Sequence, residues 1–247
     1  MRTVRFHVTR IERGRIALPP DEAHHARSVL RSRIGDRVEL FDGRGAVGRG
    51  TICTIERHTV EVEVEVEHVE QIEYDLRHRI VLAVAVGKAH RQSYLVEKCT
   101  ELGAAGIWAI RSERSVTKPG EFAAEKWAKR AIESCKQCGR AWAPEVDGPF
   151  RVEQALARRG DFAAMALADP IDRAIPFDGF LRTVSAGSSV LVWVGPEGGW
   201  TDAERSNLIA NGATAVRLAP TILRTETAAV AACASAAMVS LTMTPSA

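Results

Sequence analysis

Hydrophobic and polar residues alternate most regularly in residues 59–70, TVEVEVEVEHVE. Successive side chains of a strand point to opposite faces, so this pattern predicts a β-strand with valines on one face and glutamates on the other. Shorter strand-like segments precede it, and Asp42, Gly43 and Gly45 provide turn signals between them. The strands predicted in this region are residues 3–8, 15–18, 37–41, 48–55 and 59–70. Together they are typical of a small all-β barrel.

A helix is predicted to interrupt these strands. Pro20 follows a second proline and leads into Asp21, a residue type that often caps a helix at its N-terminus. At helical spacing four apolar residues then share one face, which we expect to be buried: Ala23, Ala26, Val29 and Leu30. Arg27 and Arg31 point away from that face.

From Arg79 onwards the pattern changes to apolar, β-branched runs that alternate with helical periodicity. This alternation is typical of βαβ units and predicts an α/β domain with a parallel sheet. The predicted strands are residues 80–86, 107–110, 162–168, 190–194 and 215–218. The predicted helices are residues 95–102, 121–138, 201–210 and 226–241. The change of pattern divides the chain into domains of residues 1–72 and 73–247.

Composition changes this picture only through the distribution of charge. The chain has 247 residues, with 33 Lys and Arg against 31 Asp and Glu, a net charge of +2. That balance conceals an Arg-rich first segment, because residues 1–50 contain 11 Arg against 6 acidic residues. Residues 51–75 are acidic, with 1 Arg against 8 acidic residues. A nucleic-acid partner therefore stays compatible with the near-neutral total.

Targeting signals and cysteines favour a cytoplasmic protein. The first ten residues, MRTVRFHVTR, lack the apolar run of a signal peptide. Five irregularly spaced cysteines do not form the pattern of a disulfide-rich secreted scaffold. Residues 227–247 carry no charge, but Ala, Ser and Thr dominate them, so we expect a buried helix there rather than a membrane span.

The histidines and cysteines give little support to metal or nucleophilic chemistry in the second domain. All seven histidines lie within the first 90 residues, which leaves no His for a triad or a zinc site there unless the other domain supplies it. Cys135 and Cys138 form a C-x-x-C pair without partner ligands at similar spacing. We interpret them as packing residues at a helix end and expect no metal.

The most informative segment is residues 190–204, VLVWVGPEGGWTDAE. An apolar strand runs into the turn Gly195-Pro196-Glu197-Gly198-Gly199, and the T-x-x-E spacing that follows is a capping box that begins a helix. The glycines allow a ligand to approach the backbone closely. The turn matches neither the dinucleotide fingerprint G-x-G-x-x-G nor a P-loop, and Glu197 would repel a pyrophosphate. An ordinary turn from strand to helix is the alternative.

A second candidate loop is residues 218–227, LAPTILRTET, which leads into an Ala-rich helix. Open α/β sheets bind ligands at the carboxyl ends of parallel strands, and both candidate loops follow predicted strands at that end. The small side chains of the helix would allow close packing inside the fold or against a second subunit. A plain buried helix with a threonine cap is the alternative.

These motifs, taken in order, resemble the RsmE family of 16S rRNA (uracil-N3) methyltransferases, part of the SPOUT superfamily. The resemblance covers nearly the whole chain, with departures at Ala219, where the family usually has Gly, and at Thr221, where a larger residue is common. The matching segments are RSVLR (27–31), LFDG (40–43), EKCTELG (97–103), SERSV (112–116), QCGR (137–140), VGPEGG (194–199) and LRTET (223–227).

The resemblance implies a PUA-like β-barrel for RNA binding, followed by a SPOUT-type α/β domain with a C-terminal trefoil knot. It also implies a homodimer and S-adenosylmethionine as the cofactor, bound by loops of the knot at residues 167–170, 195–199 and 218–227. The cofactor-binding residues implied are Leu167, Ala168, Gly195, Pro196, Glu197, Gly198, Gly199, Leu218, Ala219, Leu223, Thr225 and Thr227.

The implied reaction methylates N3 of a uridine in the decoding region of 16S rRNA, in the small ribosomal subunit. We expect Arg224 to stabilise negative charge on the uracil oxygens, and Glu226, or a water that it orients, to accept the N3 proton. Arg27, Arg31 and Arg33 are the candidates for binding phosphates, although a solvated helix face is the alternative. Another SPOUT-class RNA methyltransferase, a nicotinamide-dependent oxidoreductase and a non-catalytic RNA-binding module are the competing functions.

Overall fold

The computed structural model describes residues 3–56, 62–85, 87, 89–115, 123–169, 171 and 173–243. The chain divides into two compact units. The first unit contains Met1–Tyr74 together with Ile132–Ala143, and the second contains Asp75–Ala131 together with Pro144–Ala247. The first unit is therefore completed by a segment that comes from the middle of the second.

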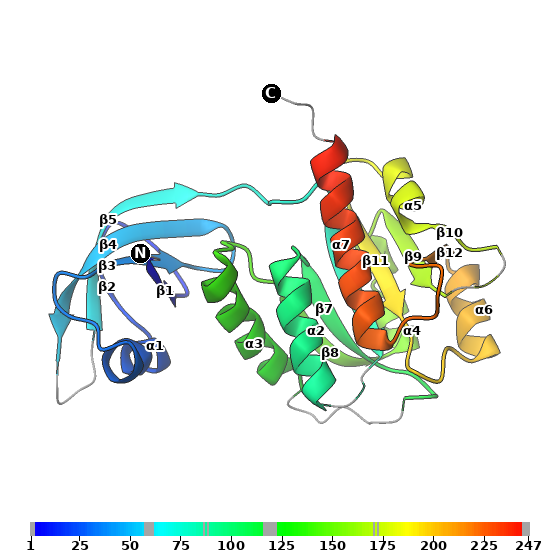
Figure 1. Ribbon diagram of the computed structural model, residues 1–247, viewed down its shortest axis with the longest axis horizontal. Helices are drawn as coiled ribbons and strands as arrows, with labels where there is room; N and C mark the ends of the chain where they lie inside the picture. The colour runs from blue at the N-terminus through cyan, green and yellow to red at the C-terminus, as the bar shows by residue number, and fades with distance from the viewer. Residues whose placement is uncertain are drawn as a thin grey trace. The chain divides into compact units, whose positions relative to one another are not determined.

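The first unit is built on a five-stranded sheet in the order β1-β3-β4-β5-β2. The pairing of β1 with β3 is parallel and the other pairings are antiparallel. Its strands are β1 (Val4–His7), β2 (Gly14–Ala17), β3 (Arg37–Phe41), β4 (Ala46–Ile55) and β5 (Val62–Gln71) (Figure 1). In β5 the side chains of Val64 and Val66 are buried while Glu65 and Glu67 are exposed, as the alternation predicts. Residues 59–61 of the predicted strand lie outside the described residues.

The helix of the first unit differs from its prediction. Helix α1 (Pro20–His24) begins after Pro19, so Asp21 lies inside the first turn and is not the cap. A π-helix, His25–Val29, follows at once, and the N–H of Leu30 donates to the carbonyl of His25. This wider turn shifts the later residues off the face that Ala23 and Ala26 occupy. The prediction that Val29 and Leu30 are buried was therefore wrong, because 62% and 40% of their surfaces are exposed.

The second unit contains a seven-stranded sheet in the order β10-β12-β9-β11-β6-β7-β8, and every pairing in it is parallel. This confirms the α/β class. The strands are β6 (Arg79–Ala85), β7 (Gly106–Arg111), β8 (Glu145–Arg151), β9 (Ala164–Ala168), β10 (Ile175–Pro176), β11 (Ser189–Val194) and β12 (Ala213–Arg217). The sequence patterns missed β8 and β10.

Helices pack on both faces of this sheet and form two apolar cores. Residues of α2, α3, α5 and α7 join the core on one face, and residues of α4 and α6 join the core on the other. The helices are α2 (Ala89–Glu101), α3 (Ala123–Cys138), α4 (Val152–Leu156), α5 (Phe177–Thr183), α6 (Asp202–Ala210) and α7 (Thr225–Met243). The second half of α3 belongs to the first unit.

Helix α7 is packed as the sequence predicts for a small-residue helix. Ala229, Ala232, Cys233, Ala236 and Val239 are buried in the core of the second unit. Among the described residues it is also the one helix long and apolar enough, by length and composition, to cross a membrane. It packs against α2 and α5, and 33% of its most apolar 18-residue window is buried.

Candidate functional site

Three neighbouring strands of the second unit carry the candidate loops. Strand β9 lies between β12 and β11, and all three run parallel. Their carboxyl ends therefore meet at one edge of the sheet, which is where open α/β sheets bind ligands. The segments that follow them begin at Asp169, Gly195 and Leu218. The fold thus brings together three segments that are well separated in the sequence.

The turn after β11 has little space around its first glycine. A Cβ atom added at Gly195 would lie 2.9 Å from the indole nitrogen of Trp200, so a larger residue would displace that buried ring. Gly199 has a φ of +69°, a backbone conformation that favours glycine. These two glycines are needed for the path of the backbone.

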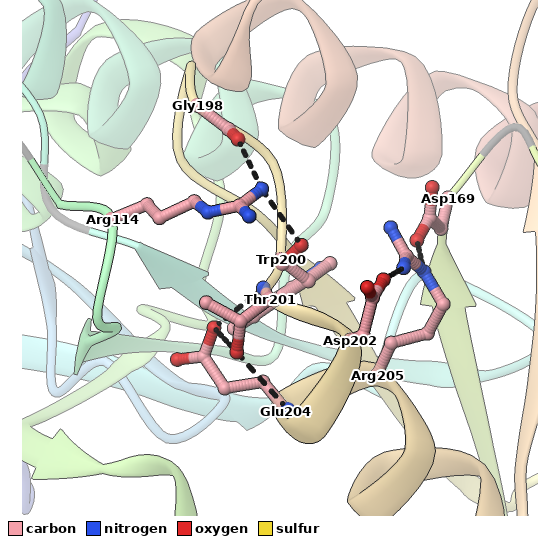
Figure 2. Close-up of polar contacts among 8 residues, drawn as sticks. All are labelled: Arg114, Asp169, Gly198, Trp200, Thr201, Asp202, Glu204 and Arg205. Carbon is pink, nitrogen blue, oxygen red and sulfur yellow. Dashed lines mark hydrogen bonds and ion pairs between the residues drawn. The ribbon is translucent and has the colours of Figure 1, made fainter.

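A capping box fixes the end of this turn, as predicted. Thr201 is the N-cap of α6, and its hydroxyl accepts a hydrogen bond of 3.2 Å from the N–H of Glu204 (Figure 2). The Glu204 carboxylate accepts in return from the N–H of Thr201, at 3.0 Å. Its other oxygen accepts from the N–H of Glu113, at 2.9 Å. Glu204 is buried, and these donors provide hydrogen bonds to both oxygens of its carboxylate.

Arg114 connects the segment after β7 to the same turn. Its Nη1 donates to the carbonyl oxygens of Gly198 and Trp200, at 3.2 and 3.4 Å (Figure 2). A guanidinium presents several donors in a fixed plane and is therefore suited to bridging two carbonyls. Arg114 belongs to the SERSV segment, but its role in shaping the turn could not be predicted from the motif alone.

The segment after β9 is held through an ion pair. Arg205 of α6 donates from Nε to Asp169 at 2.6 Å and from Nη1 to Asp202 at 2.7 Å (Figure 2). The Asp169 carboxylate raises the pKa of Arg205, so this guanidinium keeps its charge. The pair connects the end of β9 with the first turn of α6. Pro170, the last residue of this predicted cofactor loop, lies outside the described residues.

The loop after β12 is joined to the turn after β11 through Thr225. Its hydroxyl donates a 2.8 Å hydrogen bond to the carbonyl oxygen of Gly195. A cavity of about 60 Å³ lies at the carboxyl ends of β9 and β12. Its lining comes from the ends of β9 and β12, the loop after β12 and the start of α7, and includes Ala168, Asp169, Val216, Leu218, Ala219 and Leu223. A wider, more open pocket of about 640 Å³ shares Arg217, Leu218 and Ala219 with it.

Two carboxylates of the site share one arginine. Arg91, in the first turn of α2, lies 3.5 Å from Glu197 and 3.6 Å from Glu226. The Glu226 side chain is 13% exposed. Gly87 lies next to the Glu197 carboxylate, because a Cβ added at Gly87 would be 3.4 Å from a Glu197 oxygen. One guanidinium therefore contacts both carboxylates. Arg91 could not be predicted as a site residue from the sequence, because only the fold brings it to residues more than 100 positions away.

The predicted residues do not form a single cluster. Ten of the twelve predicted cofactor-binding residues belong to the segments after β11 and β12 and the start of α7, with Thr227 exposed on α7. Leu167 and Ala168 are instead the last residues of β9, and Leu167 is fully buried in the apolar core. Arg224 is exposed directly before α7, and its carbonyl accepts from the N–H of Ala228 at 2.8 Å. Arg27, Arg31 and Arg33 belong to the first unit, whereas these loops belong to the second. Groups of three or more His, Cys, Asp or Glu suited to a metal are absent from the described residues.

Comparisons with known proteins identify both parts of the chain. Residues 75–237 match a family model described as an RNA methyltransferase domain, and residues 18–65 match an RNA methyltransferase PUA domain. The chain is 31% identical to ribosomal RNA small subunit methyltransferase E of Synechocystis sp. over 86% of this chain and 69% of that protein. The Mycobacterium bovis protein of the same name is 32% identical, over 86% of this chain and 82% of its own length.

A solved structure agrees with these relatives. Ribosomal RNA small subunit methyltransferase E from Neisseria gonorrhoeae, crystallised with S-adenosyl methionine bound, aligns with a TM-score of 0.81 and 29% identity. The alignment covers 94% of this chain and 96% of that one. The similarity therefore extends through both units.

Proposed function

The chain belongs to the family of ribosomal RNA small subunit methyltransferase E, and from this membership we propose that it transfers a methyl group from S-adenosylmethionine to N3 of a uridine in 16S rRNA. The observation that carries the proposal is the junction of three loops at the carboxyl ends of β9, β11 and β12. It lies within the part of the chain that matches the RNA methyltransferase domain.

The charge of the site fits this cofactor better than a dinucleotide. When bound, S-adenosylmethionine supplies an electrophilic methyl group on a positively charged sulfonium. Glu197 and Glu226 place two carboxylates on either side of Arg91, and carboxylates attract a sulfonium cation and repel a pyrophosphate. The residues that would hold the cofactor are Leu167, Ala168, Gly195, Pro196, Glu197, Gly198, Gly199, Leu218, Ala219, Leu223, Thr225 and Thr227.

The proposed chemistry needs two side chains near the start of α7. Uridine N3 carries a proton, and its loss places negative charge on the neighbouring oxygens. We assign stabilisation of this charge to Arg224, whose exposed side chain is accessible to a base. Glu226, or a water that it orients, accepts the proton. Arg91 orients the Glu226 carboxylate through their 3.6 Å contact.

The remaining features of the proposal concern assembly. We propose that the chain is threaded through a trefoil knot at these loops and that it acts in the cytoplasm as a homodimer. The outer side of α7 supports a subunit contact, because Met238 and Leu241 expose 58% and 76% of their surfaces. Residues 1–72 would act as the RNA-binding domain and residues 73–247 as the methyltransferase. Analytical ultracentrifugation of the wild type and of Leu241→Glu tests the dimer, which the charge should dissociate.

Methyl transfer to defined substrates tests the central proposal. The protein is incubated with methyl-labelled S-adenosylmethionine and either 16S rRNA or small subunits, and the digested nucleosides are identified by mass spectrometry. We expect N3-methyluridine. Label on another nucleoside would indicate a different RNA methyltransferase. Calorimetric binding of NADH without binding of S-adenosylmethionine would indicate the oxidoreductase, and RNA binding without either cofactor would indicate a non-catalytic module.

A further inference from the structure

Three large apolar side chains are exposed within six residues of the first unit. Val29, Leu30 and Ile34 expose 62%, 40% and 66% of their surfaces, and together we call them the ridge. Single exposed apolar residues are common on soluble proteins, whereas adjacent ones more often mark a binding surface. Among the described residues of the first unit, Ile72 is the only other large apolar side chain that is exposed.

The backbone beneath the ridge has two unusual conformations. The π-helix His25–Val29 directs Val29 and Leu30 away from the core, and single π-turns often occur at functional sites. Arg31 has a φ of +54° and is the one described residue other than glycine with a positive φ. Such a conformation is unfavourable for a long side chain. Two unfavourable features next to each other expose side chains that a regular helix would bury.

The segment is nevertheless held in place by hydrogen bonds. The N–H of Ser32 donates to the Ala26 carbonyl at 2.9 Å, which closes the end of the helix. The N–H of Arg33 donates to the Asp36 carboxylate at 2.7 Å, and the N–H of Gly35 donates to the Ile52 carbonyl of β4 at 2.9 Å. The ridge is therefore presented on a supported backbone.

Three arginines alternate with the ridge residues. Arg31 and Arg33 are exposed, and no ion pair is formed by either within the described part of the chain. Arg27, on the preceding turn, donates to the Glu56 carbonyl at 3.5 Å. Apolar side chains flanked by positive charge are complementary to a nucleic acid, which presents unpaired base faces between phosphates.

We propose that the ridge packs against the face of an unpaired base of the substrate rRNA while Arg31 and Arg33 bind the adjacent phosphates. This inference rests on the proposed function, and it adds an apolar contact to what would otherwise be a purely electrostatic surface. Apolar side chains that contact or separate stacked bases position a strand without reading its sequence. The ridge would therefore help to hold single-stranded RNA while another nucleotide reaches the methyl-transfer site.

The two kinds of contact respond differently to salt, and this provides the test. Binding to a protein-free 16S rRNA fragment is measured from low to high salt for Val29→Ser/Ile34→Ser and for Arg31→Gln/Arg33→Gln. The serine variant should bind about tenfold to a hundredfold more weakly at every salt concentration with an unchanged salt slope. The glutamine variant should reduce the slope of log affinity against log salt by roughly 0.7 per arginine. Ile209→Ser, an exposed apolar residue of α6, is the matched control and should bind as the wild type does.

Unchanged affinity of the serine variant, with an unchanged melting temperature, would overturn the inference. A loss seen only with intact small subunits would overturn it as well, because the ridge would then contact a ribosomal protein. Methyl transfer by the wild type distinguishes this failure from failure of the proposed function. If the wild type methylates the RNA and the serine variant binds normally, the ridge proposal alone is wrong.

Discussion

Strands β5 and β11 show how differently the two units are stabilised. In β5 buried valines alternate with exposed glutamates, so one side of the sheet forms the core. In β11 every residue from Val190 to Val194 is buried, because helices cover both faces. The second unit therefore has two apolar cores and places its polar residues at the strand ends. The first unit has less apolar surface to bury.

The first unit also contains buried charged side chains. Arg5 is 8% exposed and donates to Glu39 at 2.7 Å and to the carbonyls of Cys135 and Arg140. Lys136 is also 8% exposed, and its ammonium lies 2.8 Å from Glu22. Buried pairs of this kind add less stability than their geometry suggests, but losing one partner is costly. We therefore expect substitutions in the first unit to affect stability and substitutions at the loops of the second to affect activity.

The largest effect is expected at Arg224. Arg224→Ala should reduce methyl transfer by about a thousandfold or more, since charge on the uracil oxygens would lose its stabilising group. Binding of S-adenosylmethionine, followed by calorimetry, should stay within a few-fold of the wild type, and the melting temperature should not change. Arg159→Ala, an exposed arginine of the same unit, is the control. Unchanged turnover would refute the role of Arg224.

Loss of the buried ion pair between Lys136 and Glu22 should instead lower the stability of the protein. Lys136→Met leaves the Glu22 carboxylate without its buried partner and should lower the free energy of unfolding by about 3–5 kcal/mol. Denaturant titration measures the free energy of unfolding. Adding Glu22→Gln to the Lys136→Met variant should restore part of the lost stability. Lys126→Met, on the exposed side of α3, should change stability little. Equal stability of the two lysine variants would contradict the difference between the units.

Arg91 should affect the rate with little effect on stability. Arg91→Gln removes the positive charge between Glu197 and Glu226 and should lower kcat about tenfold to a hundredfold, with KM for RNA unchanged. Arg91→Lys should recover part of the rate, which a purely structural role would not predict. Lys98→Gln on the same helix is the control. Loss of activity that follows the melting temperature would contradict a positioning role.

A smaller effect is expected where the loops are joined. Thr225→Val removes the hydroxyl that donates to Gly195 and leaves that carbonyl without its donor, a change of about 1 kcal/mol. Calorimetry should show S-adenosylmethionine binding weakened about fivefold. Thr242→Val, whose hydroxyl donates within the exposed end of α7, should bind the cofactor normally. Equal affinities of the two variants would show that this hydrogen bond does not support the site.

The smallest effect concerns the pH dependence of stability. Burial lowers the pKa of His7 below its usual 6.5, although the Asp42 backbone and the Glu22 charge act in the opposite direction. The unfolded chain then binds the proton more readily than the folded one does. Stability should therefore fall as the pH is lowered through 6.5 toward the folded-state pKa. Comparing His7→Gln with the wild type by thermal denaturation isolates this contribution, which the glutamine variant should lack.

Individual helices and strands could be predicted from the sequence more fully than the order in which the strands lie side by side in the sheet. Strands with clear periodicity, such as β5 and β11, were found, whereas β8 was missed because its sequence EVDGPFR has no apolar run. The burial of Val29 was wrongly predicted, since a π-turn leaves no periodic signal. The candidate loops were identified from their glycines and from the resemblance. Their meeting depends on β9 lying between β11 and β12, a strand order that no local pattern encodes.

The shared helix α3 has a consequence for how this protein can be divided. Ile132–Ala143 returns to the first unit and carries Lys136 and Trp142, whose indole donates to the Ile72 carbonyl at 3.0 Å. A fragment cut near residue 72 would separate Glu22 from Lys136 and expose surfaces that this segment covers. The N-terminal segment therefore does not form the whole of the first unit by itself. A truncated protein that retains the whole first unit has to extend to Ala143.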